Sequence, residues 1–336
     1  MPKAKQNLLS NAAVPVRKPL PPAYGKQIME PYKPKHGLRH RILQHRTLYL
    51  LFIPVFAYFV LFKYWPIAMA WIVAFKELQL GSGVFDSPWV GLQNFRDIFG
   101  SPDIPNVIRN TIEISLLRLL FGFFPPILLA IMFHDMVTRR LKKWLQTFVY
   151  IPHFFSWVIV FGVVFGFFSV GAGFVNNMLD ALGFARHEFL LDANWFRPIL
   201  IGSALWKEVG WSTIIYLAAL ATVDAQLYEA AVLDGAGPLK RIRYITLPSI
   251  MPVVTFVLCI NLGFLLNAGG EQVLLFYNDA VMDRADIIDT WVYREGLARL
   301  QFSIAAAVGL FQSVIGLALV VICNAFAKKI SGRGIW

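Results

Sequence analysis

The chain has 336 residues and a formal net charge of +11, and 57% of its residues are hydrophobic whereas only 15% are charged. Ordinary soluble domains contain about a quarter charged residues. A chain with so few charges could not cover its apolar atoms in water. The composition therefore excludes an ordinary soluble domain and favours a protein surrounded by lipid.

The first 46 residues differ in composition from the rest of the chain. They contain ten lysines and arginines, one acid (Glu30) and seven prolines. Such a segment cannot bury enough apolar surface to offset the entropy lost on ordering. We therefore predict that residues 1–46 form a disordered basic tail in the cytoplasm, rather than a nucleic-acid-binding element or a secretory signal.

Long apolar segments follow this tail. A membrane-spanning helix requires about 20 largely apolar residues. The segments that meet this requirement are residues 47–75, 110–133, 147–170, 198–221, 249–268 and 303–327. The sequence thus predicts an all-α polytopic membrane protein of about six transmembrane helices. We expect the transmembrane domain to cover residues 47–327 and a short cytoplasmic tail to follow at 328–336.

The basic residues predict the orientation of these helices, because cytoplasmic loops are enriched in lysine and arginine. With the N-terminus in the cytoplasm, cytoplasmic segments collect 20 of the 31 lysines and arginines, and the outer loops collect eight against thirteen acids. The C-terminus is then cytoplasmic as well. Two outer stretches, 89–99 and 174–182, have helical spacing of apolar residues, which predicts short amphipathic helices at the outer surface.

Small and soft side chains within the spans suggest packing roles. Gly162 and Gly166 form a GxxxG pattern, which predicts close helix packing within the chain, with pairing of subunits as the alternative. Cys259 and Cys323 lie in apolar runs, and we expect packed thiols there rather than a disulfide or a metal site. His153 could line a path through the membrane or form a structural hydrogen bond.

The cytoplasmic loop at 222–248 carries the most informative pattern in the chain. An alanine-rich helix is predicted at 221–233, followed by a glycine turn at Gly235 and Gly237. Pro238 suits the first position of a second short helix, which we expect to end at Leu247 and Pro248. This glycine turn lacks the spacing of a nucleotide-binding phosphate loop, so the chain is not expected to bind ATP.

This loop resembles the signature loop of permease subunits of ATP-binding-cassette (ABC) importers, which reads Glu-Ala-Ala, three residues, Gly, nine residues, Ile-x-Leu-Pro. The matching residues are Glu229, Ala230, Ala231, Gly235, Ile245, Leu247 and Pro248. In that family the loop docks in a cleft of the ATPase subunit. The resemblance implies that residues 229–235 form the docking face and that the fold is of the MetI-like, type I importer class.

Further stretches resemble the polysaccharide branch of the maltose-type permeases, which serves complex oligosaccharides, including uronate-rich ones such as alginate or pectin fragments. These stretches are residues 62–66, 90–95, 150–157, 206–211 and 289–293. The resemblance implies a non-catalytic subunit of the bacterial cytoplasmic (inner) membrane. Its partners would be a second homologous permease, two ATPase subunits that bind ATP and Mg, and an extracytoplasmic solute-binding protein.

Polar residues at membrane depth indicate a substrate pathway, because burying them is costly unless they face a cavity or a partner. From the helical rise, Lys207 and Gln312 lie roughly 13–14 Å below the outer boundary of their spans, and Asn261 lies near the same layer. The adjoining aromatic rings of Trp206 and Phe311 suit sugar rings. We expect these five residues to line the pathway, although Lys207 and Asn261 could instead connect neighbouring helices.

Two functions other than oligosaccharide import are compatible with a polytopic membrane protein. A permease of the same architecture could carry another small solute, such as glycerol phosphate. A membrane-embedded enzyme would require a catalytic constellation, but the sequence contains neither an HExxH nor a GxSxG motif. We therefore expect a transport subunit without a metal site or a cofactor of its own.

Overall fold

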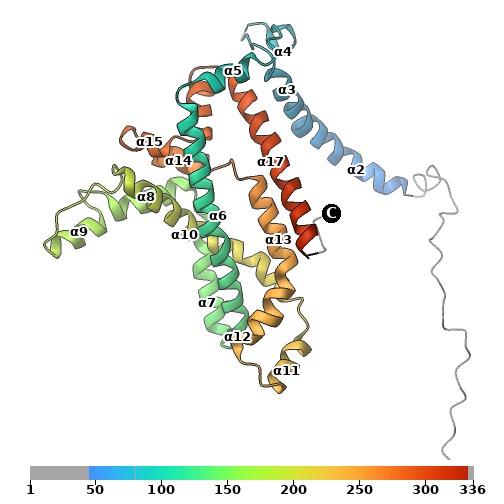
Figure 1. Cartoon of the computed structure of the whole chain (residues 1–336), viewed down its shortest axis with the longest axis vertical. Coiled ribbons are helices and arrows are strands. Elements are labelled where there is room, and N and C mark those ends of the chain that lie inside the picture. The colour runs from blue at the N-terminus through green and yellow to red at the C-terminus, as the bar shows by residue number, and fades with distance from the viewer. Residues whose placement is uncertain (1–44, 80, 332–336) are drawn as a thin grey trace, which may run out of the picture. The chain divides into compact units, whose positions relative to one another are not determined.

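The computed structural model describes residues 45–79 and 81–331, and its elements are helices (Figure 1). Within those ranges the pairing of extended segments is limited to one isolated bridge between Lys76 and Trp89. The predicted all-α class is confirmed. The basic tail predicted at 1–46 lies almost entirely outside the described residues, as does the end of the C-terminal tail at 332–336.

Four of the six predicted spans overlap single helices of sufficient length and hydropathy, and the third and fourth overlap helices that meet this requirement only as bent pairs. Among the described residues, the single helices long and apolar enough to cross a membrane are Arg46–Val73, Ile104–Asp135, Pro238–Gly263 and Phe302–Lys329. Two further segments meet the requirement as bent pairs, namely Arg139–Phe154 with Trp157–Phe168 and Ala193–Leu220 with Ala225–Leu233.

The chain divides into two units between Lys63 and Tyr64. The described part of the first unit is α2 (Arg46–Phe59) and most of a π-helical turn, η2 (Val60–Tyr64), which buries no side chain within the chain. A surface that is apolar on every side suits contact with lipid. The π turn precedes Pro66, which has no N–H to donate to the carbonyl four residues earlier.

Four long helices form the centre of the second unit: α6 (Ile104–Asp135), α10 (Ala193–Leu220), α13 (Leu247–Gly263) and α17 (Phe302–Ser331). α6 packs along α10, and α13 packs against both α10 and α17 (Figure 1). Leu200 and Tyr216 of α10 are buried in separate apolar clusters that hold it against α6. A side chain at Gly316 of α17 would collide with the carbonyl of Gly263, so glycine permits the close approach of α13 and α17.

The third span is bent by 105° between α7 (Arg139–Tyr150) with η3 (Ile151–Phe154) and α8 (Trp157–Phe168). Phe155 is extended at the bend, and the Ser156 side chain accepts a hydrogen bond from the Ile159 N–H to begin α8. We predicted close packing within the chain at Gly162 and Gly166. That prediction is wrong, because a Cβ at either position would meet no other described atom within 4 Å.

Short helices connect the long ones. They are α3 (Trp65–Val73), α4 (Gly83–Asp86), α5 (Gln93–Gly100), α9 (Phe174–Ala181), α11 (Ala225–Leu233), α12 (Pro238–Arg241), η4 (Ile242–Thr246), α14 (Gly270–Phe276), η5 (Asp279–Val281), α15 (Met282–Ala285), α16 (Ile288–Trp291) and η6 (Val292–Ala298). α5 and α9 confirm the short helices predicted in the outer loops. α4 and α5 lie at one end of the long helices, and α11 and α12 lie at the other (Figure 1).

The two cysteines form a disulfide in this structure. Cys259 of α13 and Cys323 of α17 are joined, with their Cα atoms 5.5 Å apart, a separation within the usual range. Our expectation of unpaired, packed thiols is therefore wrong. The pairing depends on α13 and α17 lying side by side, which brings together positions 64 residues apart in the sequence.

Candidate functional site

The signature loop forms an exposed hairpin whose first half is α11. The Asp224 side chain caps this helix by accepting a hydrogen bond from the Gln226 N–H at 2.9 Å. Gly235 ends the helix in the left-handed region at φ +73°, and the N–H groups of Gly235 and Ala236 bond back to α11 carbonyls. This is the Schellman arrangement that commonly ends helices. No residue of α11 is buried within the chain.

The second half of the loop continues into the fifth span. Pro238 begins α12 as predicted, but no break occurs at Leu247 and Pro248, because η4 joins α12 to α13 in one helical segment from Pro238 to Gly263. The π turn at Ile242–Thr246 precedes Pro248 and takes up the missing hydrogen bond. The predicted end of the second helix is therefore wrong.

The seven signature residues fall into two groups. Glu229, Ala230, Gly235 and Pro248 are exposed, whereas Ala231, Ile245 and Leu247 are partly buried. Leu247 packs against the apolar cluster between α6, α10 and α13. The exposed members are free to contact another protein, and Leu247 fixes the loop to the transmembrane helices.

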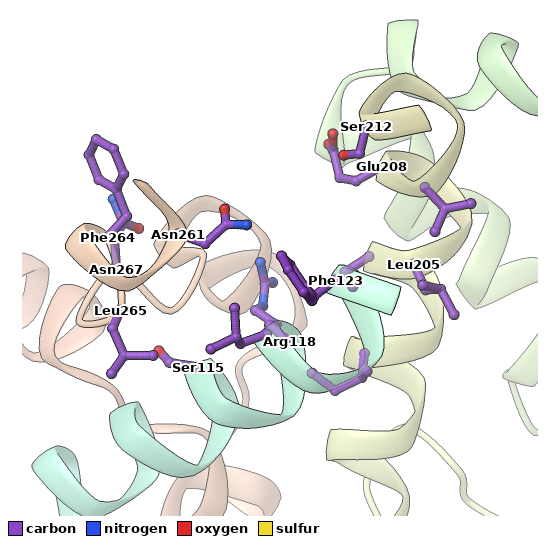
Figure 2. Close-up of a pocket in the computed structure, with 15 residues that line it drawn as sticks. Ser115, Arg118, Phe123, Leu205, Glu208, Ser212, Asn261, Phe264, Leu265 and Asn267 are labelled. Carbon is purple, nitrogen blue, oxygen red and sulfur yellow. The ribbon is translucent and has the colours of Figure 1, made fainter. Parts of the chain in front are cut away.

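A polar cavity of about 260 Å³ lies between α6, α10 and the C-terminal end of α13 (Figure 2). Its polar lining residues are Ser115, Arg118, Glu208, Ser212, Asn261 and Asn267. Arg118 and Glu208 are 14 and 15 residues from the starts of α6 and α10, which places them roughly 21–23 Å along these helices. The cavity therefore lies near the midpoints of both.

Arg118 is held at one side of this cavity. Its guanidinium donates to the Oε1 atom of Gln272, a fully buried residue of α14. The Gln272 Nε2 atom in turn donates to the Leu200 carbonyl and to Ser203 Oγ of α10, each at 2.8 Å. The Arg118 Nε atom is buried without a hydrogen-bond partner among the described residues.

Glu208 faces Arg118 from α10, and Figure 2 shows it beside Ser212, across the cavity from Asn261. The carboxylate is already engaged, since its Oε2 atom lies 2.9 Å from His153 Nδ1 and its Oε1 atom lies 3.4 Å from Lys207 Nζ. The His153 ring stacks on Trp211 with a centroid separation of 4.4 Å. Glu208 thus joins the cavity to the bend in the third span.

Lys207 does not line the cavity. It is 6% exposed, its Nζ donates to the His153 carbonyl at 2.6 Å, and it lies 5.4 Å from the Trp157 ring centroid. These contacts match the alternative considered from the sequence, in which Lys207 connects neighbouring helices. Trp206 is 42% exposed, and the centroid of its ring lies 6.2 Å from that of Phe155, also outside the cavity.

The other predicted pathway residues separate as well. Asn261 lines the cavity, but Phe311 packs edge-to-face on Phe99 in an apolar pocket. Gln312 donates to the Leu266 carbonyl and to Asp289 Oδ1, both at 3.3 Å, in a groove between α13 and α17. Of the five predicted residues, only Asn261 lines the cavity. The other four point elsewhere, because helical rise gives the depth of a residue but not the direction of its side chain.

Two carboxyl groups in the segments between the predicted spans have altered acidity. The Asn194 N–H lowers the pKa of Asp192, the residue that caps α10. Burial raises the pKa of Asp289, and its bond with Gln312 opposes this shift. Among the described residues there is no group of three or more His, Cys, Asp or Glu side chains that could hold a metal ion.

Comparison with known proteins extends this picture. Residues 122–332 match the family described as the inner membrane component of binding-protein-dependent transport systems. Protein LplB of Bacillus subtilis (strain 168) is 43% identical over 293 residues, covering 87% of this chain and 91% of LplB. The polygalacturonan/rhamnogalacturonan transport system permease protein YteP of the same strain is 42% identical over 298 residues, covering 88% of this chain and 92% of YteP.

A solved structure agrees with this match. The crystal structure of a bacterial alginate ABC transporter, in complex with an alginate pentasaccharide-bound periplasmic protein, contains a chain that is 39% identical to this one. The TM-score is 0.81, and the match covers 89% of this chain and 99% of the other. The fold is thus the MetI-like permease fold predicted from the sequence, and the chain belongs to the inner-membrane permease family of binding-protein-dependent ABC transport systems, whose members transport solutes rather than catalyse reactions.

Proposed function

We propose that this chain is the transmembrane subunit of an ATP-driven importer that carries an oligosaccharide through the cavity between α6, α10 and α13. The cargo class is supported by two relatives, one named for polygalacturonan/rhamnogalacturonan transport and one crystallised as an alginate transporter. Both names point to acidic glycans. Glycerol phosphate, the other solute considered, is the competing cargo.

The main support for this proposal is that α10 runs from the polar cavity to the exposed signature loop. This single helix of 28 residues supplies Glu208 and Ser212 to the polar cavity and leads, through a bend of 76°, into the exposed α11. A polar cavity near the middle of apolar helices is costly unless it serves a polar solute. An exposed hairpin next to the same helix gives a partner direct mechanical access to the cavity.

The proposed partners are compatible with this arrangement. Two ATPase subunits bind ATP and Mg and receive the exposed hairpin, which includes Glu229 and Gly235. A second homologous permease completes the transmembrane pathway, and an extracytoplasmic binding protein delivers the sugar at the opposite end. The basic residues of α7 and of the α12 turn lie on the cytoplasmic side, and both termini are cytoplasmic, in agreement with the distribution of charge.

The mechanism is alternating access. Closure of the two ATPase subunits on ATP draws the hairpins together, and each hairpin moves its α10 helix as a lever. The cavity then opens outward to receive sugar, and it opens inward after hydrolysis. The chain itself supplies a pathway and a mechanical connection, and the energy comes from ATP bound in another subunit.

Reconstitution tests the proposal. The complete transporter would be placed in liposomes with its binding protein, and ATP-dependent uptake of labelled trigalacturonate, a neutral trisaccharide and sn-glycerol 3-phosphate would be measured. We expect uptake of an oligosaccharide that requires ATP. Uptake of glycerol phosphate with neither trisaccharide transported would contradict the proposed cargo class.

A further inference from the structure

The cavity contains an arginine, Arg118, that forms no ion pair with another described residue. The charged residues of α6 and α10 at this depth are Arg118, Lys207 and Glu208. Lys207 and Glu208 form an ion pair, so their charges cancel, and the second Glu208 oxygen is engaged by His153. None of the ion pairs formed by the described residues includes Arg118. A buried cation whose nearest carboxylate is already paired with Lys207 and His153 is costly and favours an anionic ligand.

The guanidinium of Arg118 is also fixed in place. Gln272 Oε1 accepts a hydrogen bond from one of its N–H groups. The Gln272 Nε2 atom donates to the Leu200 carbonyl and to Ser203 Oγ of α10, and these two bonds prevent the amide from turning away. The guanidinium lies against Gly269, where the backbone has φ +82° and a Cβ would overlap the guanidinium atoms. Because it is oriented in advance, little side-chain entropy is lost when it binds a ligand.

The rest of the cavity is suited to hydroxyl groups. Asn261 and Ser115 offer both donors and acceptors beside Arg118, and Glu208 offers carboxylate oxygens on the opposite side. A carboxylate entering the cavity would be attracted by Arg118 of α6. The hydroxyl groups of the same uronate unit would then lie toward α10, where Glu208 and Ser212 line the cavity.

From these observations we infer that Arg118 is the specificity-determining residue of the pathway, binding the carboxylate of an acidic sugar unit as the oligosaccharide passes. Gln272 and Gly269 are positioning residues that act through Arg118. This inference rests on the proposed function, because it assigns one step of oligosaccharide transport to a particular side chain. A guanidinium binds a carboxylate through two parallel N–H donors, which a lysine cannot reproduce.

The first test compares two cargoes in the complete reconstituted transporter. Trigalacturonate and its carboxyl-reduced, neutral counterpart have the same length and linkage. Arg118→Gln should lower uptake of the acidic trimer about 10- to 100-fold, the factor expected for losing a hydrogen bond between charged groups, and leave the neutral trimer within about twofold. Arg118→Lys should fall between the wild type and Arg118→Gln.

A matched control is available on the same helix. Arg109 of α6 is paired with Glu113 and its side chain is 66% exposed, outside the cavity. Arg109→Gln also removes one arginine from α6, and it should leave the uptake of both trimers unchanged. If Arg118→Gln lowered the two trimers equally, or lowered neither, the inference would be overturned, because Arg118 would then have a structural role or none.

The second test avoids selection by the binding protein. Ser212→Cys places a thiol on the cavity wall, and its alkylation by a neutral maleimide would be followed in the transporter in lipid nanodiscs. Trigalacturonate should slow this alkylation, and combination with Arg118→Gln or Gly269→Ala should remove the protection. The alkylation rate without trimer reports whether each variant retains its fold. Protection that persists without Arg118 would overturn the inference.

The outcomes also separate this inference from the proposed function. If the wild-type transporter imports only the neutral trimer, oligosaccharide transport stands and the role of Arg118 in selecting acidic cargo is refuted. If it imports neither trimer, the proposed function fails and the inference fails with it. If sn-glycerol 3-phosphate alone is imported and is lost in Arg118→Gln, the guanidinium binds a phosphate, and selection of an acidic sugar is refuted.

Discussion

The conformation of Gly235 makes the signature loop sensitive to a single methyl group. Its φ of +73° lies in the left-handed region, where a residue with a Cβ is strained by about 1–2 kcal/mol. No described atom lies within 4 Å of the position that a Cβ would take. The strain therefore comes from the backbone and not from a collision within this chain. Because α11 buries no residue, we expect the loop to change conformation without unfolding of the transmembrane helices.

The expected effect of Gly235→Ala is a loss of coupling. A strain of about 1–2 kcal/mol lowers the population of the native loop about 5- to 30-fold relative to its alternatives. Sugar transported per ATP hydrolysed should fall by a factor in this range in proteoliposomes, while membrane insertion is unchanged. Gly235→Asn should lose less, because asparagine tolerates the left-handed region better than alanine does.

Gly237 provides the matched control. It lies two residues further along the same turn, has an ordinary φ of −68° as the residue before α12, and has equally open surroundings. Gly237→Ala should cost less than about 1 kcal/mol and keep transport close to that of the wild type. Equal coupling ratios for Gly235→Ala and Gly237→Ala would refute the argument from backbone conformation, and normal transport by both would also count against the docking role of the loop.

Three further predictions concern other parts of the chain. A cysteine at the exposed Asp279 should react with a membrane-impermeant reagent from outside and one at Lys240 only from inside, and the reverse pattern would overturn the orientation. Glu229→Lys should keep the subunit assembled and uncouple ATP hydrolysis from uptake, and normal uptake per ATP would argue against docking at Glu229. Lys207→Met should lower the free energy of unfolding by about 1.5–3 kcal/mol, the value of a hydrogen bond to a charged group, whereas Asn261→Leu should lower uptake without a loss of stability. Thermal unfolding and uptake assays distinguish these two effects. If Lys207→Met lowered uptake and left stability unchanged, Lys207 would be a pathway residue after all.

The parts of the fold that depend on local sequence were predictable. Long apolar runs mark the spans because lipid excludes unpaired backbone groups, so each run must be a helix. The turn at Gly235 and the start of α12 at Pro238 follow from the conformational limits of glycine and proline. The bend at residues 155–156 was not predicted, because the apolar run continues across it and hydropathy does not depend on helix direction.

The cavity could not be predicted from the sequence alone, because its lining depends on which helix faces meet. Depth along a helix can be calculated from the rise per residue, and on that basis Lys207 and Gln312 resembled pathway residues. The direction of a side chain depends on helix packing, which turned Lys207 toward His153 and Gln312 toward Asp289. Arg118 was visible in the sequence as a charge within the second span. Its position in the cavity depends on Gln272, 154 positions later in the sequence, which accepts its hydrogen bond.

The position of Glu208 connects the cavity with the bend of the third span and, along α10, with the signature loop. Glu208 faces the cavity on α10, while its oxygens contact His153 next to the bend of the third span and Lys207 of α10 itself. The same helix ends at Leu220, shortly before α11. We propose that docking of α11 moves α10 through the turn at residues 221–224, which would change the distance between Glu208 and Arg118 of α6 as well as the contacts at the bend. A cargo carboxylate bound to Arg118 would then respond to the state of the docking loop, which gives one physical route from ATP hydrolysis to release of an acidic sugar.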